Sequence, residues 1–218
     1  MRCFIFSNMI QSHFFLALLW IVYCTLHSLL AASSVKLWIQ KRMRAGYKYY
    51  RIAYTIFSFL GLIAILIYQF SISSRLLFSP PQWSKWLGLV VMIAGGLVML
   101  LMIWKYFMQL SGIRWLTEEE MEARLEVKGL HRFVRHPLYM GTFLFLWGWF
   151  VFNPMISFFI ATLIITIYTL IGLELEEKKL IDQFGDAYIE YKKKVPRLIP
   201  RLRYKMPDAG YQIPNSVD

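Results

Sequence analysis

The chain has 218 residues, of which 58% are hydrophobic and 17% aromatic, and its formal net charge at pH 7 is +11. An apolar fraction this high excludes an ordinary soluble domain and indicates an integral membrane protein. Because most of the positive charge lies in loops beside apolar runs, it reflects membrane topology, and we expect no nucleic-acid partner.

Four apolar runs approach the roughly 20 residues that a membrane-spanning helix needs. They cover about residues 14–32, 52–72, 86–107 and 155–173. A fifth run, 138–152, would cover only about 22 Å of a hydrocarbon core about 30 Å thick. Asn153-Pro154 joins it to the last run, which leaves room only for a tight helical hairpin. We therefore predict an all-α polytopic membrane protein with about five transmembrane helices, a short helical hairpin and a cytoplasmic amphipathic C-terminal helix.

Some polar and small residues inside these runs bear on whether the chain binds a ligand or packs its helices closely. His13 and His27 would lie about 21 Å apart along one helix, so they could not bind one metal ion or one haem together. We expect no metal site, and we interpret His27 as a polar group that is hydrogen-bonded within the bundle or touches substrate. The pair Gly95-Gly96 indicates a point of close helix packing.

The loop before the short fifth run has two signals. Thr117-Glu118-Glu119-Glu120 is typical of a capping box and predicts a short helix that ends at Lys128-Gly129. Then Arg135-His136-Pro137 stands at the start of the fifth run. Pro137 favours the first turn of a helix and moves His136 into a capping position.

The start of that helix offers free backbone N–H groups and the positive end of the helix dipole, which favour a bound carboxylate. Ionisable groups at membrane depth are costly and therefore indicate a functional site. The alternative is an interfacial belt, in which Arg135 extends toward the headgroups and Tyr139 anchors the helix.

A cluster of carboxylates, Glu174, Glu176 and Glu177, ends the last apolar run. One interpretation is a solvated helix end, paired with Lys178 and Lys179. The other is a shared interfacial pocket, because the hairpin returns these carboxylates to the start of the fifth run.

Beyond the carboxylates, apolar residues recur at near-helical spacing and predict an amphipathic helix. They are Leu180, Phe184, Tyr188, Tyr191 and Val195. Gly185-Asp186 is expected to divide this helix, with the glycine as the stop and the aspartate as the next cap. We expect one domain over 1–205, in which about 117–200 forms the functional part, and a disordered tail at 206–218.

Lysine and arginine are concentrated in three segments. Of the 24 such residues, six lie between Lys36 and Arg51, six between Lys105 and Arg135, and nine between Lys178 and Lys205. The positive-inside rule then places the N-terminus outside and the C-terminus in the cytoplasm.

Two motifs lie on either side of the hairpin: Gly129-x5-Arg135-His136-Pro137-x-Tyr139-x-Gly141, and Glu176-Glu177-x2-Leu180-x3-Phe184-Gly185-x2-Tyr188-x2-Tyr191-x3-Val195-Pro196. Together they resemble the isoprenylcysteine carboxyl methyltransferase superfamily, which includes phospholipid methyltransferases. Looser motifs, His27-Ser28-Leu29-Leu30-Ala31 and Tyr50-Arg51-x2-Tyr54, resemble its bacterial small-thiol (methanethiol) and denitrification-associated branch.

The resemblance implies methyl transfer from S-adenosyl-L-methionine to an acceptor that arrives from the membrane. By motif match, the cofactor-binding residues would be His136, Leu138, Tyr139, Glu176 and Glu177, with Glu176 holding the cationic part of the cofactor. The candidate catalytic residues are His131, which could deprotonate a thiol, and Arg135.

Two departures from the family pattern bear on the acceptor. His131 stands where many relatives carry tyrosine. The apolar segment Leu170-Ile171-Gly172-Leu173 stands where prenylcysteine enzymes tend to carry an arginine for the substrate carboxylate. We therefore expect a thiol or a small lipophilic acceptor rather than a prenylcysteine carboxylate or a phospholipid amine. The alternative function is a non-catalytic membrane scaffold that retains the fold, and the oligomeric state stays open.

Overall fold

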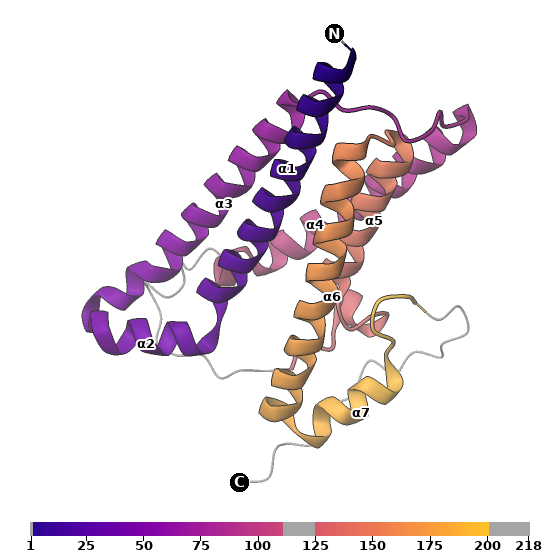
Figure 1. Cartoon of the computed structure of the whole chain (residues 1–218). Helices are drawn as coiled ribbons and strands as arrows, with labels where there is room; N and C mark the ends of the chain where they lie inside the picture. Colours follow the sequence, from indigo (N-terminus) through magenta and orange to yellow (C-terminus); the bar gives the residue numbers. More distant parts are fainter. Residues whose placement is uncertain (1, 111–124, 201–218) are drawn as a thin grey trace.

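The computed structural model describes residues 2–110 and 125–200, and these are helical apart from short connections (Figure 1). In chain order the elements are α1 (Arg2–Ala31), α2 (Ser33–Met43), the 3-10 turn η1 (Arg44–Gly46), α3 (Tyr47–Ser71), α4 (Gln82–Leu110), the 3-10 turn η3 (Gly129–Arg132), α5 (Pro137–Phe152), α6 (Ile156–Phe184) and α7 (Asp186–Lys194). In these ranges the only β-type pairing is an isolated bridge between Leu76 and Met155.

Four of the described helices are long and apolar enough to cross a membrane. The candidate spans are Asn8–Ala31, Ile52–Ser71, Gln82–Tyr106 and Ile156–Phe184, and α5 is a shorter apolar helix. Large apolar side chains point outward, among them Phe14 and Trp104, which are 72% and 83% exposed. Such a surface suits hydrocarbon rather than water, and the predicted all-α polytopic fold is confirmed.

The connections divide between the two ends of the bundle. The start of α1, the α3–α4 connection and the α5–α6 turn lie at one end, whereas α2 and α7 lie at the other (Figure 1). At the first end the α3–α4 connection pairs with the hairpin turn, because Leu77 N donates to Pro154 O at 2.8 Å and Ile156 N donates to Arg75 O at 3.0 Å. This division matches the alternating topology that the charge pattern predicts.

Helices α4 and α5 pack backbone against backbone through glycines. A Cβ atom on Gly95 would lie 2.3 Å from the backbone nitrogen of Phe145, and one on Gly148 would lie 2.5 Å from that of Met92. Only a residue without a side chain allows this approach. The close packing predicted at Gly95 is confirmed, and it fixes the position of α5, whose first turn carries the Arg-His-Pro motif.

Helices α1, α3 and α6 form a second packing unit. Leu16, Trp20, Ile65 and Ala161 are buried together in its centre. Within it the Trp20 indole donates to Gln69 Oε1 at 2.9 Å, so a buried polar pair joins α1 to α3. Interhelical hydrogen bonds of this kind hold apolar helices in register where there is no water to compete.

Three local expectations need correction. The predicted helix ending at Lys128 is wrong over its described part, because residues 125–127 are not helical; the capping box at 117–120 lies outside the described residues, as does the 206–218 tail. Gly129 has a φ of +64° and begins η3 instead of ending a helix. Helix α2 has no counterpart in the prediction, because Lys and Gln residues interrupt its apolar residues, which form no long run.

The end of the last span also differs from the prediction. Helix α6 continues without interruption through Glu177 to Phe184, so the carboxylate cluster lies inside a helix rather than at its end. Gly185, with a φ of +53°, ends α6 as predicted. It is also the N-cap of α7, and Asp186 is the first helical residue rather than the cap. The apolar face of α7 packs on the chain itself: Tyr188, Tyr191 and Val195 are buried against Leu125 and Val127.

Candidate functional site

The Arg-His-Pro motif forms the turn into α5. His136 is the N-cap, with φ −124° and ψ 69°, and Pro137 opens the helix, as the sequence predicts. The backbone N–H of Arg135 donates to Pro196 O at 2.9 Å, and that of His136 donates to Arg197 O at 3.2 Å. The segment that follows α7 therefore runs alongside the motif and satisfies its backbone donors.

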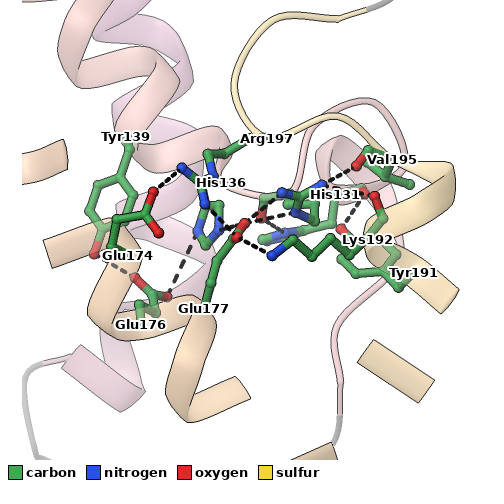
Figure 2. A network of polar contacts seen from close by, with 11 residues as sticks. His131, His136, Tyr139, Glu174, Glu176, Glu177, Tyr191, Lys192, Val195 and Arg197 are labelled. Carbon is green, nitrogen blue, oxygen red and sulfur yellow. Dashed lines mark hydrogen bonds and ion pairs between the residues drawn. The ribbon is translucent and has the colours of Figure 1, made fainter. Parts of the chain in front are cut away.

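Glu177 lies at the centre of the site, and its side chain is only 2% exposed. Its Oε1 atom accepts hydrogen bonds from Arg135 Nε at 2.9 Å and Nη2 at 2.6 Å. Its Oε2 atom accepts from Arg197 Nη2 at 2.7 Å and lies 3.2 Å from Lys192 Nζ. Figure 2 shows this carboxylate between His136, Arg197 and Lys192. A buried carboxylate is stable only when it is paired and hydrogen-bonded in this way.

Arg135 uses the rest of its guanidinium on the backbone. Its Nη1 donates to Lys192 O at 3.1 Å and to Val195 O. The residue is 8% exposed. The side chain therefore connects α6 to the C-terminal end of α7, and it does not extend toward a membrane surface as the interfacial-belt interpretation required.

The second half of the site is more open. The hydroxyl of Tyr139 donates to Glu176 Oε2 at 2.6 Å, and its ring stacks on His136 with centroids 5.7 Å apart. Glu176 Oε1 lies 4.0 Å from His136 Nδ1, and the Glu176 side chain stays 43% exposed. This carboxylate thus keeps one oxygen without a close partner among the described residues.

Glu174 forms the outer edge of the site. It accepts a short hydrogen bond from Arg197 Nη1, and its side chain is 58% exposed. Within the described ranges, the partners of the three carboxylates come from the Arg-His-Pro turn, the first turn of α5, α7 and the segment after α7. The interpretation as a solvated helix end paired with Lys178 and Lys179 therefore does not describe Glu177.

His131 lies behind the motif, and both of its ring nitrogens are engaged. Nδ1 is 3.0 Å from Arg135 O, and because a carbonyl only accepts, Nδ1 carries the hydrogen. Nε2 then accepts from the hydroxyl of Tyr106 at 3.0 Å. Tyr191 donates to His131 O at 2.6 Å, so the residue links α4, the motif and α7.

Burial lowers the pKa of both site histidines below the ordinary value of 6.5. For His131 the chief cause is desolvation, which outweighs its hydrogen bond to the Arg135 carbonyl. For His136 desolvation again outweighs the neighbouring carboxylates Glu176 and Glu177, which act in the opposite direction. Both rings are therefore neutral at pH 7.

The structure brings together five of the seven residues that the resemblance points to. Arg135, His136, Tyr139, Glu176 and Glu177 form one connected network. Leu138 lies half-buried in the first turn of α5, and His131 contacts the network only through the Arg135 carbonyl. Sequence reasoning missed Arg197 and Lys192. The signal for Arg197 was its place directly after Val195-Pro196, the last two residues of the second motif.

Comparison with known proteins places the chain in a family. The family described as NnrU protein matches residues 15–200. The chain belongs to the NnrU protein family. The resemblance of its motifs to the isoprenylcysteine carboxyl methyltransferase superfamily is confirmed by the names of its relatives.

The chain is similar to several curated methyltransferases. It is 30% identical over 194 residues to methanethiol S-methyltransferase 1 of Bradyrhizobium diazoefficiens, an alignment that covers 85% of the chain and 66% of that protein. It is 28% identical over 201 residues to a methanethiol S-methyltransferase of Crocosphaera subtropica, covering 84% and 73%. A protein-S-isoprenylcysteine O-methyltransferase of Schizosaccharomyces pombe is 34% identical over 82 residues, covering 36% and 34%. No solved structure matches the chain significantly.

Proposed function

We propose that the chain is an S-adenosylmethionine-dependent integral-membrane methyltransferase whose acceptor is a thiol or a small lipophilic molecule. The observation that carries this proposal is the division between two neighbouring carboxylates. Glu177 is buried and fully paired, whereas Glu176 is 43% exposed and keeps one oxygen for a ligand. A rigid network that holds a carboxylate with one available oxygen beside a helix N-terminus suits a small zwitterionic cofactor.

The residues present fit S-adenosylmethionine, which carries a carboxylate together with ammonium and sulfonium cations. Glu176 would hold the cationic part, and the first turn of α5 at Leu138 and Tyr139 would face the cofactor carboxylate. The stacked rings of His136 and Tyr139 would line the same pocket. When bound, the cofactor supplies a methyl group activated by its sulfonium.

Arg135 and Glu177 are proposed to position the site rather than to touch the reacting atoms. Their mutual hydrogen bonds and those of Arg135 to Lys192 O and Val195 O engage all three nitrogens of the guanidinium. His131 has the same kind of role, because neither ring nitrogen is free to take a proton from an acceptor. Rigid support of this kind keeps a binding site within the narrow geometry that transfer requires.

The proposed reaction needs little acid–base machinery. A thiol acceptor would release its proton to the solvent before it enters the pocket, and its sulfur would then take the methyl group that the bound cofactor supplies. The products are a thioether and S-adenosylhomocysteine. Alignment of acceptor and donor in a pocket that excludes water can supply most of the acceleration.

A thiol acceptor is favoured by the relatives and by the sequence around the site. Relatives in Bradyrhizobium diazoefficiens and Crocosphaera subtropica are named methanethiol S-methyltransferases. The turn of α6 before the carboxylates, Leu170–Leu173, is apolar and offers no cation for a substrate carboxylate. The chain spans 66% of the length of the Bradyrhizobium relative. The activity of that relative is therefore extended to this chain only as a proposal.

The test is calorimetric binding of S-adenosylmethionine to the purified, detergent-solubilised protein. The unmodified protein should bind one equivalent. Glu176→Gln should weaken binding by roughly 10- to 100-fold, the worth of one hydrogen bond to a charged group. The matched control Glu190→Gln removes an exposed carboxylate on α7 and should leave binding unchanged. Absent binding in folded protein would overturn the enzyme proposal and favour the scaffold.

We also propose that the end of the bundle that carries the site faces the cytoplasm of a bacterial cell, with the N-terminus outside. The proposal rests on the lysine and arginine residues that surround that end. The cofactor would then be bound from the cytoplasm, and an apolar acceptor would enter from the bilayer.

A further inference from the structure

A polar and aromatic cluster lies inside the bundle on the side of α1 and α3. His27 of α1 lies 3.0 Å and 3.1 Å, through its two ring nitrogens, from the hydroxyl of Tyr54, and its Nδ1 lies 3.2 Å from Ser58 Oγ. The ring of Tyr23 stacks on the imidazole with centroids 5.9 Å apart. Polar side chains in a membrane-spanning helix are costly, so a gathered set of them indicates a binding surface.

Tyr168 of α6 joins this cluster to the methyl-transfer site. Its ring meets that of His27 edge-on at 6.5 Å, and its hydroxyl accepts from Ser28 Oγ at 3.1 Å. Glu176, which accepts the hydrogen bond of Tyr139, lies eight residues beyond Tyr168 on the same helix, so α6 carries both the cluster and the proposed cofactor site.

Gly172 stands between these two groups. Tyr168, Gly172 and Glu176 follow one another at intervals of four along α6 and therefore lie on one face, over about 12 Å of helix axis. A Cβ atom on Gly172 would meet no described heavy atom within 4 Å, whereas Cβ atoms on Gly95 and Gly148 would meet backbone at 2.3 and 2.5 Å. Gly172 therefore does not serve helix packing, and the space over it is open.

The membrane spans that carry the His27 cluster have no formally charged residue up to Leu173. The spans 8–31, 52–71 and 156–173 contain no Asp, Glu, Lys or Arg. Past the Ser28–Tyr168 contact, α1 ends at Ala31 and the chain turns away from α6 into α2 (Figure 1). The position over Gly172 can thus be reached from the bilayer, and it suits an uncharged guest with a weak hydrogen-bond donor.

We propose that the face of α6 over Gly172, flanked by Tyr168 and His27, is the acceptor subsite, and that it takes a small, uncharged alkyl thiol. The inference rests on the proposed methyltransferase function and assigns the position at which the acceptor binds next to the methyl donor. The aromatic rings and hydroxyls bind the thiol. Gly172 leaves space for it because glycine has no side chain, and the extent of that space limits the size of the thiol.

The experiment places progressively larger side chains at position 172 and measures the affinity for the methyl donor and the KM of the thiol acceptor separately. Variants Gly172→Ala, Gly172→Val and Gly172→Leu are assayed for the KM of methanethiol and of hexanethiol and for the calorimetric Kd of S-adenosylmethionine. The matched control Ile171→Phe enlarges the neighbouring residue, whose side chain is 58% exposed on the outside of α6. Tyr168→Phe removes only the hydroxyl and completes the set.

The expected result is a graded rise in thiol KM, at least about 10-fold for Gly172→Leu and larger for hexanethiol than for methanethiol. The Kd of S-adenosylmethionine should stay within about twofold, and Ile171→Phe should change neither value. Tyr168→Phe should raise the thiol KM at constant cofactor affinity. If Gly172→Leu fails to bind the cofactor, the thiol KM values of Gly172→Ala and Tyr168→Phe test the subsite instead.

Three outcomes would overturn the subsite. One is an unchanged thiol KM across the glycine series and Tyr168→Phe. Another is parallel loss of cofactor and thiol affinity in every variant that folds, which would make the position structural. The third is cofactor binding by the unmodified protein with no methylation of either thiol. Failure of the proposed function looks different, because the unmodified protein would then bind no S-adenosylmethionine at all.

Discussion

Two nitrogens of Arg135 converge on a single oxygen of Glu177, at 2.9 and 2.6 Å, and leave the other oxygen to Arg197 and Lys192. One buried carboxylate therefore joins the turn into α5, the end of α7 and the segment that follows it. Glu174 and Glu176 add two more carboxylates to the three cations, so the charges of the network balance. Removing Glu177 or Arg135 would leave a buried charge without its partner.

Glu177→Gln should therefore destabilise the protein far more than Glu174→Gln. Breaking a buried ion pair by removing one partner costs roughly 3–5 kcal/mol, whereas the exposed pair of Glu174 is screened by solvent and contributes little. For a chain of this size we expect Tm to fall by at least about 6 °C in the first variant and by little in the second. Thermal unfolding of both variants in detergent measures this, and equal Tm values would contradict the central role of Glu177.

The two adjacent glycines of α4 should respond oppositely to alanine. Gly95→Ala places a methyl group against the α5 backbone and should lower Tm, because neither helix can shift without losing the glycine contacts. Gly96→Ala meets only the Phe145 side chain at 3.6 Å, an ordinary contact. It should leave Tm unchanged or raise it, since alanine is favoured over glycine in helices by about 1 kcal/mol. Equal effects would mean that the two helices are not packed as described.

Stability should fall as the pH is lowered through 6.5. The folded-state pKa of His131 and of His136 is below the ordinary value of 6.5 because both rings are buried. Between the folded and unfolded pKa values the unfolded chain binds more protons than the folded chain, so the free energy of unfolding decreases as the pH falls through that window. Above the unfolded pKa the two rings no longer reduce it. Tm measured from about pH 8 to pH 5 checks this.

The matched variant for the pH series is His136→Gln, which removes one of the two titrating rings. Its Tm should depend less steeply on pH between about 7 and 5.5 than that of the unmodified protein, even if the Tm itself is lower. A Tm that increases on acidification would contradict the lowered pKa of His136, because it would mean that Glu176 and Glu177 outweigh burial and hold the ring in its charged form.

Site-directed cysteines test the proposed orientation. In a background with Cys3 and Cys24 replaced by alanine, Ser79→Cys lies in the exposed α3–α4 connection and Lys193→Cys lies on α7 at the opposite end. A membrane-impermeant maleimide should label the first in intact cells and the second only after permeabilisation. The reverse pattern would place the site outside, and labelling of both in intact cells would contradict the division of the bundle into two ends.

Local features of the sequence predicted the elements well. Hydropathy located the spans, because a helix that crosses a bilayer must be apolar over about 20 residues wherever it packs. Pro137 and Gly185 marked a helix start and a helix end, because the proline ring and a positive φ restrict the backbone on their own. The expected helix before Gly129 failed over its described part, because capping and stop signals do not ensure that the residues between them are helical.

The sequence by itself therefore determined the class of protein, its spans and the motif residues, since hydropathy and backbone preferences act locally. Only the tertiary structure decided which carboxylate is buried and which is open, because successive residues of a helix point about 100° apart and α6 could have presented either one. The same rotation directs Gly172 into open space, and helix packing sets Gly95 rather than Gly96 against α5. The contribution of Arg197, 20 residues beyond Glu177, likewise depended on the fold of the chain that separates them.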